Sequence, residues 1–243
     1  MPERGYREQL YHRYISRIEN PEEEITLAAI ENKFSIWDGH YRRLLPADRA
    51  QKIIEIGCGS GGFIHYLRSR GYLAVSGIDI SEEQVAAAGK LGISGVTRGD
   101  FRDLLAESPG RYGTVVARDV LEHFRREEAI DILILIRQAL AEGGVFLIQT
   151  VNAASPFSLR YRWGDLTHEM AFTADSLRSA LRLAGFRRAD FFDTPPVFRH
   201  SIASAVRSVI WKGVAAVWRL ALLAESGDGR GILTGNLIAA AGK

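Results

Sequence analysis

The chain has 243 residues, 47% of them hydrophobic, which is enough for one sizeable globular domain with a packed core. Its 31 basic and 29 acidic residues leave a net charge of only +2, so the strong positive field of a nucleic-acid-binding protein is absent. The single cysteine, Cys58, excludes an intramolecular disulfide, and the polar start MPERGYREQLYHRY lacks the apolar core of a signal peptide. We therefore expect a cytoplasmic protein without a nucleic-acid partner.

The first part of the chain carries helical patterns and precedes the first strand. Asn20 and Pro21 match a helix cap and a first-turn proline, and the three glutamates at 22–24 suit the positive end of a helix dipole. We predict an N-terminal helical cap over residues 1–48 and a main domain over residues 49–243.

Short apolar runs alternate with helical stretches from residue 52 onwards. One of the predicted helices spans 173–184, with Thr173 as its cap, and another continues through the segment EEAIDILILIRQALAEGG. This alternation is typical of an α/β fold in which a parallel sheet carries helices on both faces. The seven predicted strands are KIIEIG, LAVSGIDI, SGVTRGD, YGTVVARDV, VFLIQTV, FRRADFFDT and NLIAAAG.

A glycine-rich loop follows the first strand in the segment EIGCGSGG, residues 55–62. In an open parallel sheet, glycines at this place let the backbone approach a ligand at the start of the next helix. The spacing of Gly57, Gly59 and Gly62 also fits the dinucleotide fingerprint, with Asp79 positioned for ribose hydroxyls. The loop therefore predicts a nucleotide-like cofactor, but the glycines alone do not choose which one.

Glu55 helps to choose between cofactors. A carboxylate at the end of an apolar strand is costly to desolvate unless a cation or backbone amides satisfy it. S-adenosylmethionine brings an ammonium and a sulfonium, whereas NAD brings a pyrophosphate that a nearby glutamate repels. Glu55 therefore favours the methyl donor.

Later segments extend the pattern: GIDIS at 77–81, RGDF at 98–101 and DVLEH at 119–123. With Glu55 to Gly61 matching E-x-G-x-G-x-G, the sequence resembles the class I S-adenosylmethionine-dependent methyltransferases. The resemblance implies an enzyme with a Rossmann-like, seven-stranded, mostly parallel sheet whose last hairpin is reversed, and S-adenosylmethionine as its cofactor.

The resemblance also implies the cofactor-binding residues. Asp79 would hold the ribose diol, and Asp100 and Phe101 would meet the adenine, although Asp100 as a turn residue and Phe101 as a core aromatic remain open alternatives. The expected cofactor-binding set is Glu55, Gly57, Cys58, Gly59, Gly61, Asp79, Ile80, Gly99, Asp100, Phe101, Asp119, Val120 and Leu121.

The segment WGDLTHEMAFT, residues 163–173, is predicted to form the loop after the fifth strand, at an edge where loops carry function. An alcohol is a poor nucleophile until a base removes its proton, so His168 is the candidate base, and Glu169 or Asp165 would orient its ring or replace it. His123, after the fourth strand, is a second candidate base. Either histidine has a structural alternative, in which its ring only bonds to nearby backbone.

A metal site is not expected from this loop. The segment HEMAF resembles the start of a zinc signature, but that signature needs a second histidine where Phe172 stands. The sequence shows no other histidine–carboxylate cluster that would replace it.

The same loop resembles the THE-x-x-FT segment of a bacterial branch associated with sugar or surface-polysaccharide methylation. The expected function is therefore O-methylation of a sugar or glycan hydroxyl in polysaccharide biosynthesis. Three alternatives stay open: methylation of a small phenol, quinone or amine, an NAD-dependent reductase, and a non-catalytic adenosyl-binding scaffold.

An amphipathic helix is predicted over residues 199–225, inserted between the sixth and seventh strands. Its apolar side is separated from a side that carries serines and cations, and Trp211 and Trp218 lie towards the border. Either this helix lies peripherally on the inner face of the membrane, or its apolar side packs on the protein's own sheet or on a twin subunit in a homodimer. The apolar side comprises Ile202, Val206, Val209, Ile210, Val217, Leu220 and Ala221.

Overall fold

The computed structural model describes residues 25–199 and 201–243. Of the predicted N-terminal cap, the described part contains helices α3 (Leu27–Glu31) and α4 (Phe34–Tyr41). The predicted cap at Asn20 and Pro21 lies outside the described residues. Within the described residues, helix α3 begins after Thr26, whose side chain accepts a hydrogen bond from the backbone N–H of Ala29.

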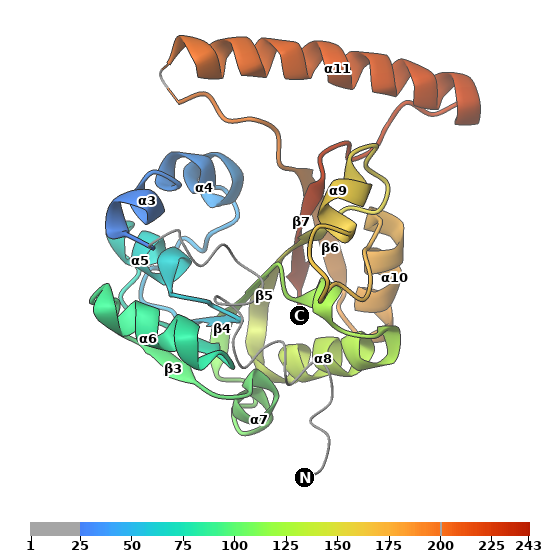
Figure 1. Ribbon diagram of the computed structural model, residues 1–243. Helices are drawn as coiled ribbons and strands as arrows, with labels where there is room; N and C mark the ends of the chain where they lie inside the picture. The colour runs from blue at the N-terminus through green and yellow to red at the C-terminus, as the bar shows by residue number, and fades with distance from the viewer. Residues whose placement is uncertain (1–24, 200) are drawn as a thin grey trace.

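All seven predicted strands are present in one sheet with the order β3-β2-β1-β4-β5-β7-β6 (Figure 1). Strand β7 runs antiparallel to both of its neighbours, β5 and β6, while the pairs among β1 to β5 are parallel. The Rossmann-like fold with a reversed last hairpin is thus confirmed. The strands are β1 (Ile53–Ile56), β2 (Val75–Asp79), β3 (Val96–Arg98), β4 (Tyr112–Arg118), β5 (Leu140–Val151), β6 (Arg188–Asp193) and β7 (Asn236–Gly242).

Helices cover both faces of the sheet because successive strand residues point to opposite sides. Ile54 and Val115 belong to a core cluster shared with helices α8 and α10, whereas Ile53 and Val116 belong to a second cluster shared with α4 and α5. The helices within the main domain are α5 (Gly62–Ser69), α6 (Glu82–Lys90), α7 (Phe101–Ala106), α8 (Arg126–Ala139), α9 (Ser158–Arg162), α10 (Ala174–Leu183) and α11 (Ile202–Ser226).

Helix α8 ends earlier than the sequence pattern predicts. The segment LAEGG, expected to complete this helix, instead begins β5, where Leu140 pairs with Tyr112 of β4. Leu140 is fully buried in the core, and Gly143 takes a positive φ of 72° that a helix does not accommodate. Core packing and strand pairing therefore override the local helical pattern.

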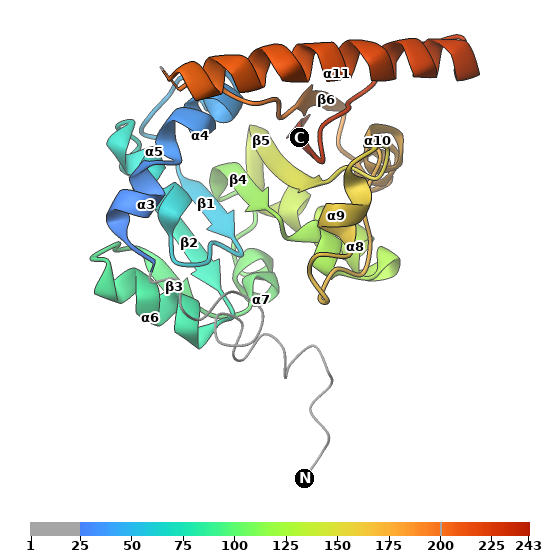
Figure 2. The same cartoon turned by 45° about the horizontal axis from the view of Figure 1, so that its top comes forward.

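Helix α11 confirms the predicted insertion between β6 and β7. Ser201 caps its start by accepting from the backbone N–H of Ser204, and Gly227 ends it in the left-handed conformation. None of its residues is buried, and Figure 1 and Figure 2 show the helix along the outside of the molecule. The alternative in which its apolar side packs on the protein's own sheet is therefore wrong. Among the described residues, no helix has the length and apolarity that crossing a bilayer requires.

Candidate functional site

The glycine-rich loop joins β1 to α5 at the carboxyl edge of the sheet. Gly57, Gly59 and Gly61 all adopt positive φ angles, of 61°, 55° and 77°. A Cβ atom added to Gly57 would lie 2.6 Å from a methyl group of Val120, so side chains are excluded by space as well as by backbone conformation. Helix α5 begins directly after this loop, which points the N–H groups of its first turn towards a ligand at this edge.

Asp79 lies at the end of β2 and holds the glycine loop in place. One of its carboxylate oxygens accepts from the Gly59 N–H at 2.7 Å, and the other accepts from the Ser81 N–H at 2.8 Å. Burial raises the pKa of this carboxyl group, and the two N–H donors oppose that change. Ile80 follows with its side chain half exposed. The residue expected to bind ribose is thus fixed beside the loop expected to bind the cofactor.

Glu55 lies buried at the end of β1. Its Oε1 is 3.6 Å from the Arg118 guanidinium, while its Oε2 is buried and has no hydrogen-bond partner among the described residues. Burial raises the pKa of Glu55 to about 8; Arg118 opposes this rise, and the carboxylates of Asp79 and Asp119 add to it. The unpartnered oxygen fits a group that brings N–H donors and positive charge, as an amino-acid ammonium does.

Arg118 is a site residue that the sequence analysis missed. It ends β4 and packs, largely but not fully buried, against the aromatic residues of α4 and α5, with its guanidinium 4.5 Å from the ring centroid of Phe63 and 4.9 Å from that of Trp37. The signal was the basic residue that ends the apolar run of YGTVVARDV. Part of the charge that Glu55 requires is therefore supplied by the chain itself.

Asp119 follows β4 and has a φ of 56°, the one positive value for a non-glycine residue in the described part of the chain. Such strain is concentrated at functional sites. The Gln149 amide nitrogen donates to both oxygens of the Asp119 carboxylate, at 2.8 and 3.0 Å. The amide oxygen of Gln149 in turn accepts from the Tyr41 hydroxyl. Gln149 of β5 is a second residue that the sequence analysis missed, because polar residues are ordinary at strand ends.

Among the other residues expected to bind the cofactor, some have side chains that contact neighbouring residues of the chain, and others have buried side chains. Asp100 caps α7, since its carboxylate accepts from the Arg102 N–H at 2.8 Å and pairs with the Arg102 guanidinium. Asp100 therefore has the local structural role that the sequence left open as an alternative. Its contact with the adenine stays a prediction. Phe101 packs edge-on against Phe124. The side chains of Cys58, Val120 and Leu121 are buried, so a ligand would meet mainly the backbone at these positions.

His168 is fixed by its own loop. Its Nδ1 lies 2.9 Å from the Tyr161 carbonyl oxygen, which can only accept, so Nδ1 carries the proton and Nε2 of the neutral ring keeps its lone pair. The Arg162 guanidinium bonds to the carbonyl oxygens of His168 and Glu169. The two alternatives for His168, a structural ring and a base, are therefore compatible. The hydrogen bond to the Tyr161 carbonyl that anchors the ring also leaves Nε2 with the lone pair that a base requires.

His123 and Asp165 lie beside His168. The two histidine ring centroids are 4.7 Å apart, and Thr167 connects His123 to Asp165, since its hydroxyl donates to Asp165 and contacts His123 Nδ1 at 2.8 Å. Burial, followed by the neighbouring His168, lowers the pKa of His123 to about 4, so this ring is neutral near pH 7. The acid of this cluster is Asp165; Glu169 instead contributes its backbone N–H, which donates to the Glu122 carbonyl oxygen.

From the sequence, no histidine–carboxylate cluster was expected to replace the incomplete zinc signature, and that expectation is wrong. Ligand atoms of His123, Asp165 and His168 all lie within 4.8 Å of one another, which is close enough to converge on a metal ion. His123 and the other two residues are far apart in the sequence, and only the packing of the loop after β5 against the end of β4 brings them together.

Glu122 is a third residue that the sequence analysis missed, although it stands within DVLEH. Its side chain is fully buried, and Oε2 accepts from the Thr150 hydroxyl at 2.9 Å. Burial raises the pKa of Glu122 to about 8, and Asp119 adds to this rise. Because its backbone carbonyl also accepts from the N–H groups of Glu169 and Met170, Glu122 connects β4, β5 and the loop of His168.

Comparison with known proteins identifies the family. A family model described as a methyltransferase domain matches residues 29–189, well over half of the chain. Ubiquinone biosynthesis O-methyltransferases from Leptothrix cholodnii and Pseudomonas aeruginosa are 31% and 27% identical to it over 107 residues, or 42% of this chain. The matched segment spans less than half of those relatives, 44% and 45% of their lengths.

Solved structures support the fold. The crystal structure of a SAM dependent methyltransferase from Archaeoglobus fulgidus is similar at a TM-score of 0.63 and 22% sequence identity, over 89% of this chain and 99% of that chain. One from Mesorhizobium loti matches at a TM-score of 0.57 and 20% identity, over 86% of this chain and 98% of that chain. With the family match and a site that suits a cationic adenosyl cofactor, the chain belongs to the methyltransferase domain family and uses S-adenosylmethionine as its methyl donor.

Proposed function

We propose that the protein methylates a hydroxyl oxygen of its acceptor and that His168 is the general base. The observation that carries this proposal is the fixed tautomer of His168, whose Nδ1 donates to the Tyr161 carbonyl and whose Nε2 keeps a lone pair. His123 and Asp165 lie beside the ring, so the positive charge that forms when His168 takes the proton is stabilised by the Asp165 carboxylate.

The cofactor supplies an activated methyl group on a sulfonium, and the chain supplies positioning. Glu55 would accept from the cofactor's ammonium, and Asp79 from its ribose hydroxyls, while the glycine loop approaches the adenosyl moiety closely. Methyl transfer needs the acceptor oxygen in line with the breaking bond, so fixed cofactor contacts and a fixed base contribute most of the acceleration.

We propose two acceptor classes, in order of preference. A sugar or glycan hydroxyl follows from the likeness of the loop at 163–173 to THE-x-x-FT, and this is the form we propose first. The ubiquinone biosynthesis O-methyltransferases of Leptothrix cholodnii and Pseudomonas aeruginosa favour methylation of oxygen on a small molecule instead. Both forms need a base near the acceptor oxygen, and the His168 cluster supplies one.

Mass spectrometry of separate acceptor classes tests the proposal. Purified protein with S-adenosylmethionine would be supplied with glycans, with small phenols and quinols, and with amines, and each product examined for one added methyl group and its position. We expect an O-methyl product and S-adenosylhomocysteine. An N-methyl product alone would contradict the proposal, and a phenolic product would replace the glycan form by the small-molecule form.

The raised pKa of Glu55 predicts pH-dependent cofactor binding. An ammonium beside Glu55 favours the carboxylate, so binding releases a proton at pH values below about 8, where Glu55 of the free protein is protonated. We expect the affinity for S-adenosylhomocysteine to fall by up to about tenfold for each pH unit below that value. Isothermal titration calorimetry between pH 6 and 8 measures this slope. The Glu55→Gln variant is expected to bind S-adenosylhomocysteine weakly and with an affinity that does not change with pH. If its affinity kept the wild-type dependence on pH, Glu55 would be excluded as the group that releases the proton.

The role of His168 as a base predicts turnover that does not require a metal. After dialysis against EDTA, the rate of methyl transfer is expected to match that of untreated enzyme, because His168 Nε2 alone accepts the proton. Assays with added Mg²⁺ or Zn²⁺ serve as the control. Loss of activity on chelation and its return with one of these ions would instead make His123, Asp165 and His168 metal ligands.

A further inference from the structure

Helix α11 presents its apolar side to the outside of the molecule. At about 100° per residue, six of its large exposed apolar side chains fall within an arc of about 120° that runs from the start of the helix to Leu220. These side chains are between 50 and 86% exposed. The members of this outward face are Ile202, Val206, Val209, Ile210, Val217 and Leu220.

The opposite side of α11 makes the contacts with the body of the protein. Ser204 accepts from the backbone N–H of Arg199, and Ser208 donates to the Pro196 carbonyl oxygen. The Trp211 ring lies 6.0 Å from that of Phe157. Trp211 is thus an apolar residue on the inward side, but the six side chains of the outward face have no cover from the protein itself, and a continuous exposed apolar face of this kind indicates a surface that another partner covers.

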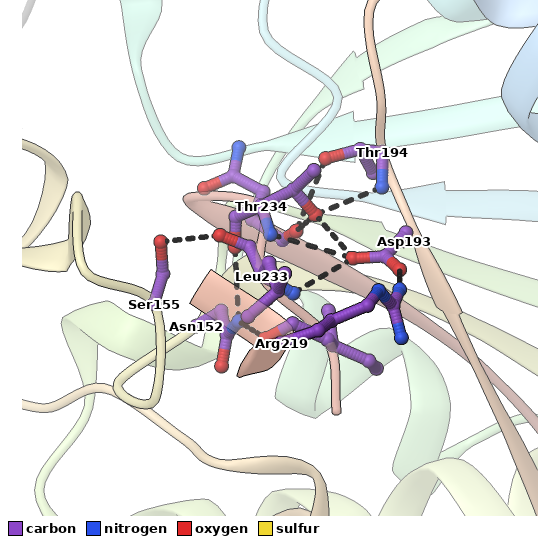
Figure 3. A network of polar contacts seen from close by, with 9 residues as sticks. Asn152, Ser155, Asp193, Thr194, Arg219, Leu233 and Thr234 are labelled. Atoms are coloured by element: carbon purple, nitrogen blue, oxygen red, sulfur yellow. Dashed lines mark hydrogen bonds and ion pairs between the residues drawn. The ribbon is translucent and has the colours of Figure 1, made fainter. Parts of the chain in front are cut away.

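A polar network holds the helix in this orientation (Figure 3). The Asp193 carboxylate at the end of β6 lies 3.8 Å from the Arg219 guanidinium of α11 and accepts from the backbone N–H of Leu233 at 2.9 Å. The carbonyl oxygen of Leu233 accepts from Ser155, in the loop after β5. The outward face is therefore fixed relative to the sheet edge that carries the site.

The charges of α11 indicate what covers the face. Arg207 and Lys212 are exposed on opposite flanks of the apolar arc, and Trp218 lies near its border. The single acid of the helix, Glu225, stands in its last turn. Apolar residues flanked by cations suit a surface that is apolar within and anionic at its rim.

We infer that α11 docks the protein onto an anionic phospholipid surface, with its outward face in the boundary between headgroups and acyl chains. A second copy of the chain is the competing occupant, but a seam between two helices buries a narrower stripe than this arc, and it would not require cations on both flanks. The helix is too polar to cross the bilayer, so the contact is peripheral.

Vesicle co-sedimentation of the full chain tests this inference. Wild-type protein is expected to bind vesicles of phosphatidylcholine with added phosphatidylglycerol, and to bind more weakly to phosphatidylcholine alone or at high salt. Val217→Glu combined with Leu220→Glu is expected to weaken binding by more than about tenfold. The matched control is Leu73→Glu, which places the same acid at an exposed leucine outside α11, just before β2.

Two further measurements keep the test decisive. The double variant is expected to bind S-adenosylhomocysteine like wild type, which separates lipid docking from the proposed methyl transfer. Reversing the flank charges with Arg207→Glu and Lys212→Glu is expected to abolish the preference for anionic vesicles. Wild-type protein that stays in the supernatant, or a variant that binds as wild type does, overturns the inference. A lipid-independent dimer that the double variant converts to monomer also overturns it, in favour of a second copy.

Discussion

Replacement of His168 by alanine is expected to lower kcat by about 10²–10⁴-fold, the usual contribution of a positioned general base. The expectation follows from the Nδ1 contact to the Tyr161 carbonyl, which leaves Nε2 as the one ring nitrogen that can take a proton. Steady-state kinetics with the acceptor found by mass spectrometry gives the ratio. Free imidazole is expected to restore part of the lost rate, which a purely structural defect would not allow.

The matched control for this prediction is His65→Ala. His65 lies on α5 and contacts Glu31 at 3.0 Å, away from the His168 cluster, so its loss is expected to leave kcat within about twofold. Both variants are expected to bind S-adenosylhomocysteine like wild type. A His168→Ala enzyme that turns over at the wild-type rate would exclude His168 as the base, and His123 or Asp165 would be the next side chain to test.

Replacement of Asp79 by alanine is expected to weaken binding of S-adenosylhomocysteine by at least about 100-fold, or about 2.8 kcal/mol. The carboxylate has two functions: it would bind the ribose hydroxyls, and it accepts from the N–H groups of Gly59 and Ser81. Its removal leaves these N–H groups without their acceptor and loosens the glycine loop against β2. Isothermal titration calorimetry measures the change in affinity.

Two further variants separate ligand contact from loop anchoring. Asp79→Asn keeps one acceptor oxygen and is expected to lose less affinity than the alanine variant. The control Asp175→Ala removes an exposed carboxylate that pairs with Arg178 on α10, and it is expected to leave the affinity for S-adenosylhomocysteine unchanged. If the Asp79→Ala protein bound S-adenosylhomocysteine within threefold of wild type, the assignment of Asp79 to the cofactor site would be wrong.

The order of elements and the cofactor end of the site could be predicted from the sequence. The central strands β1, β4 and β5 appear as apolar runs, and the glycine loop, Asp79 and Ser81, which caps α6, are all encoded in short windows of sequence. The end of α8 was the exception, because the burial of Leu140 in the sheet outweighs the helical pattern around it. Local patterns therefore predict elements well except where distant core packing competes with them.

The sequence by itself determined the fold family and the methyl donor, since period, glycine spacing and motif order are local properties. Only the tertiary structure decided which side chains meet: Arg118 beside Glu55, and His123 beside Asp165 and His168. It also decided that α11 turns its apolar side outwards. The physical reason is that contacts between distant segments depend on how the sheet and loops pack, and no short window of sequence contains that information.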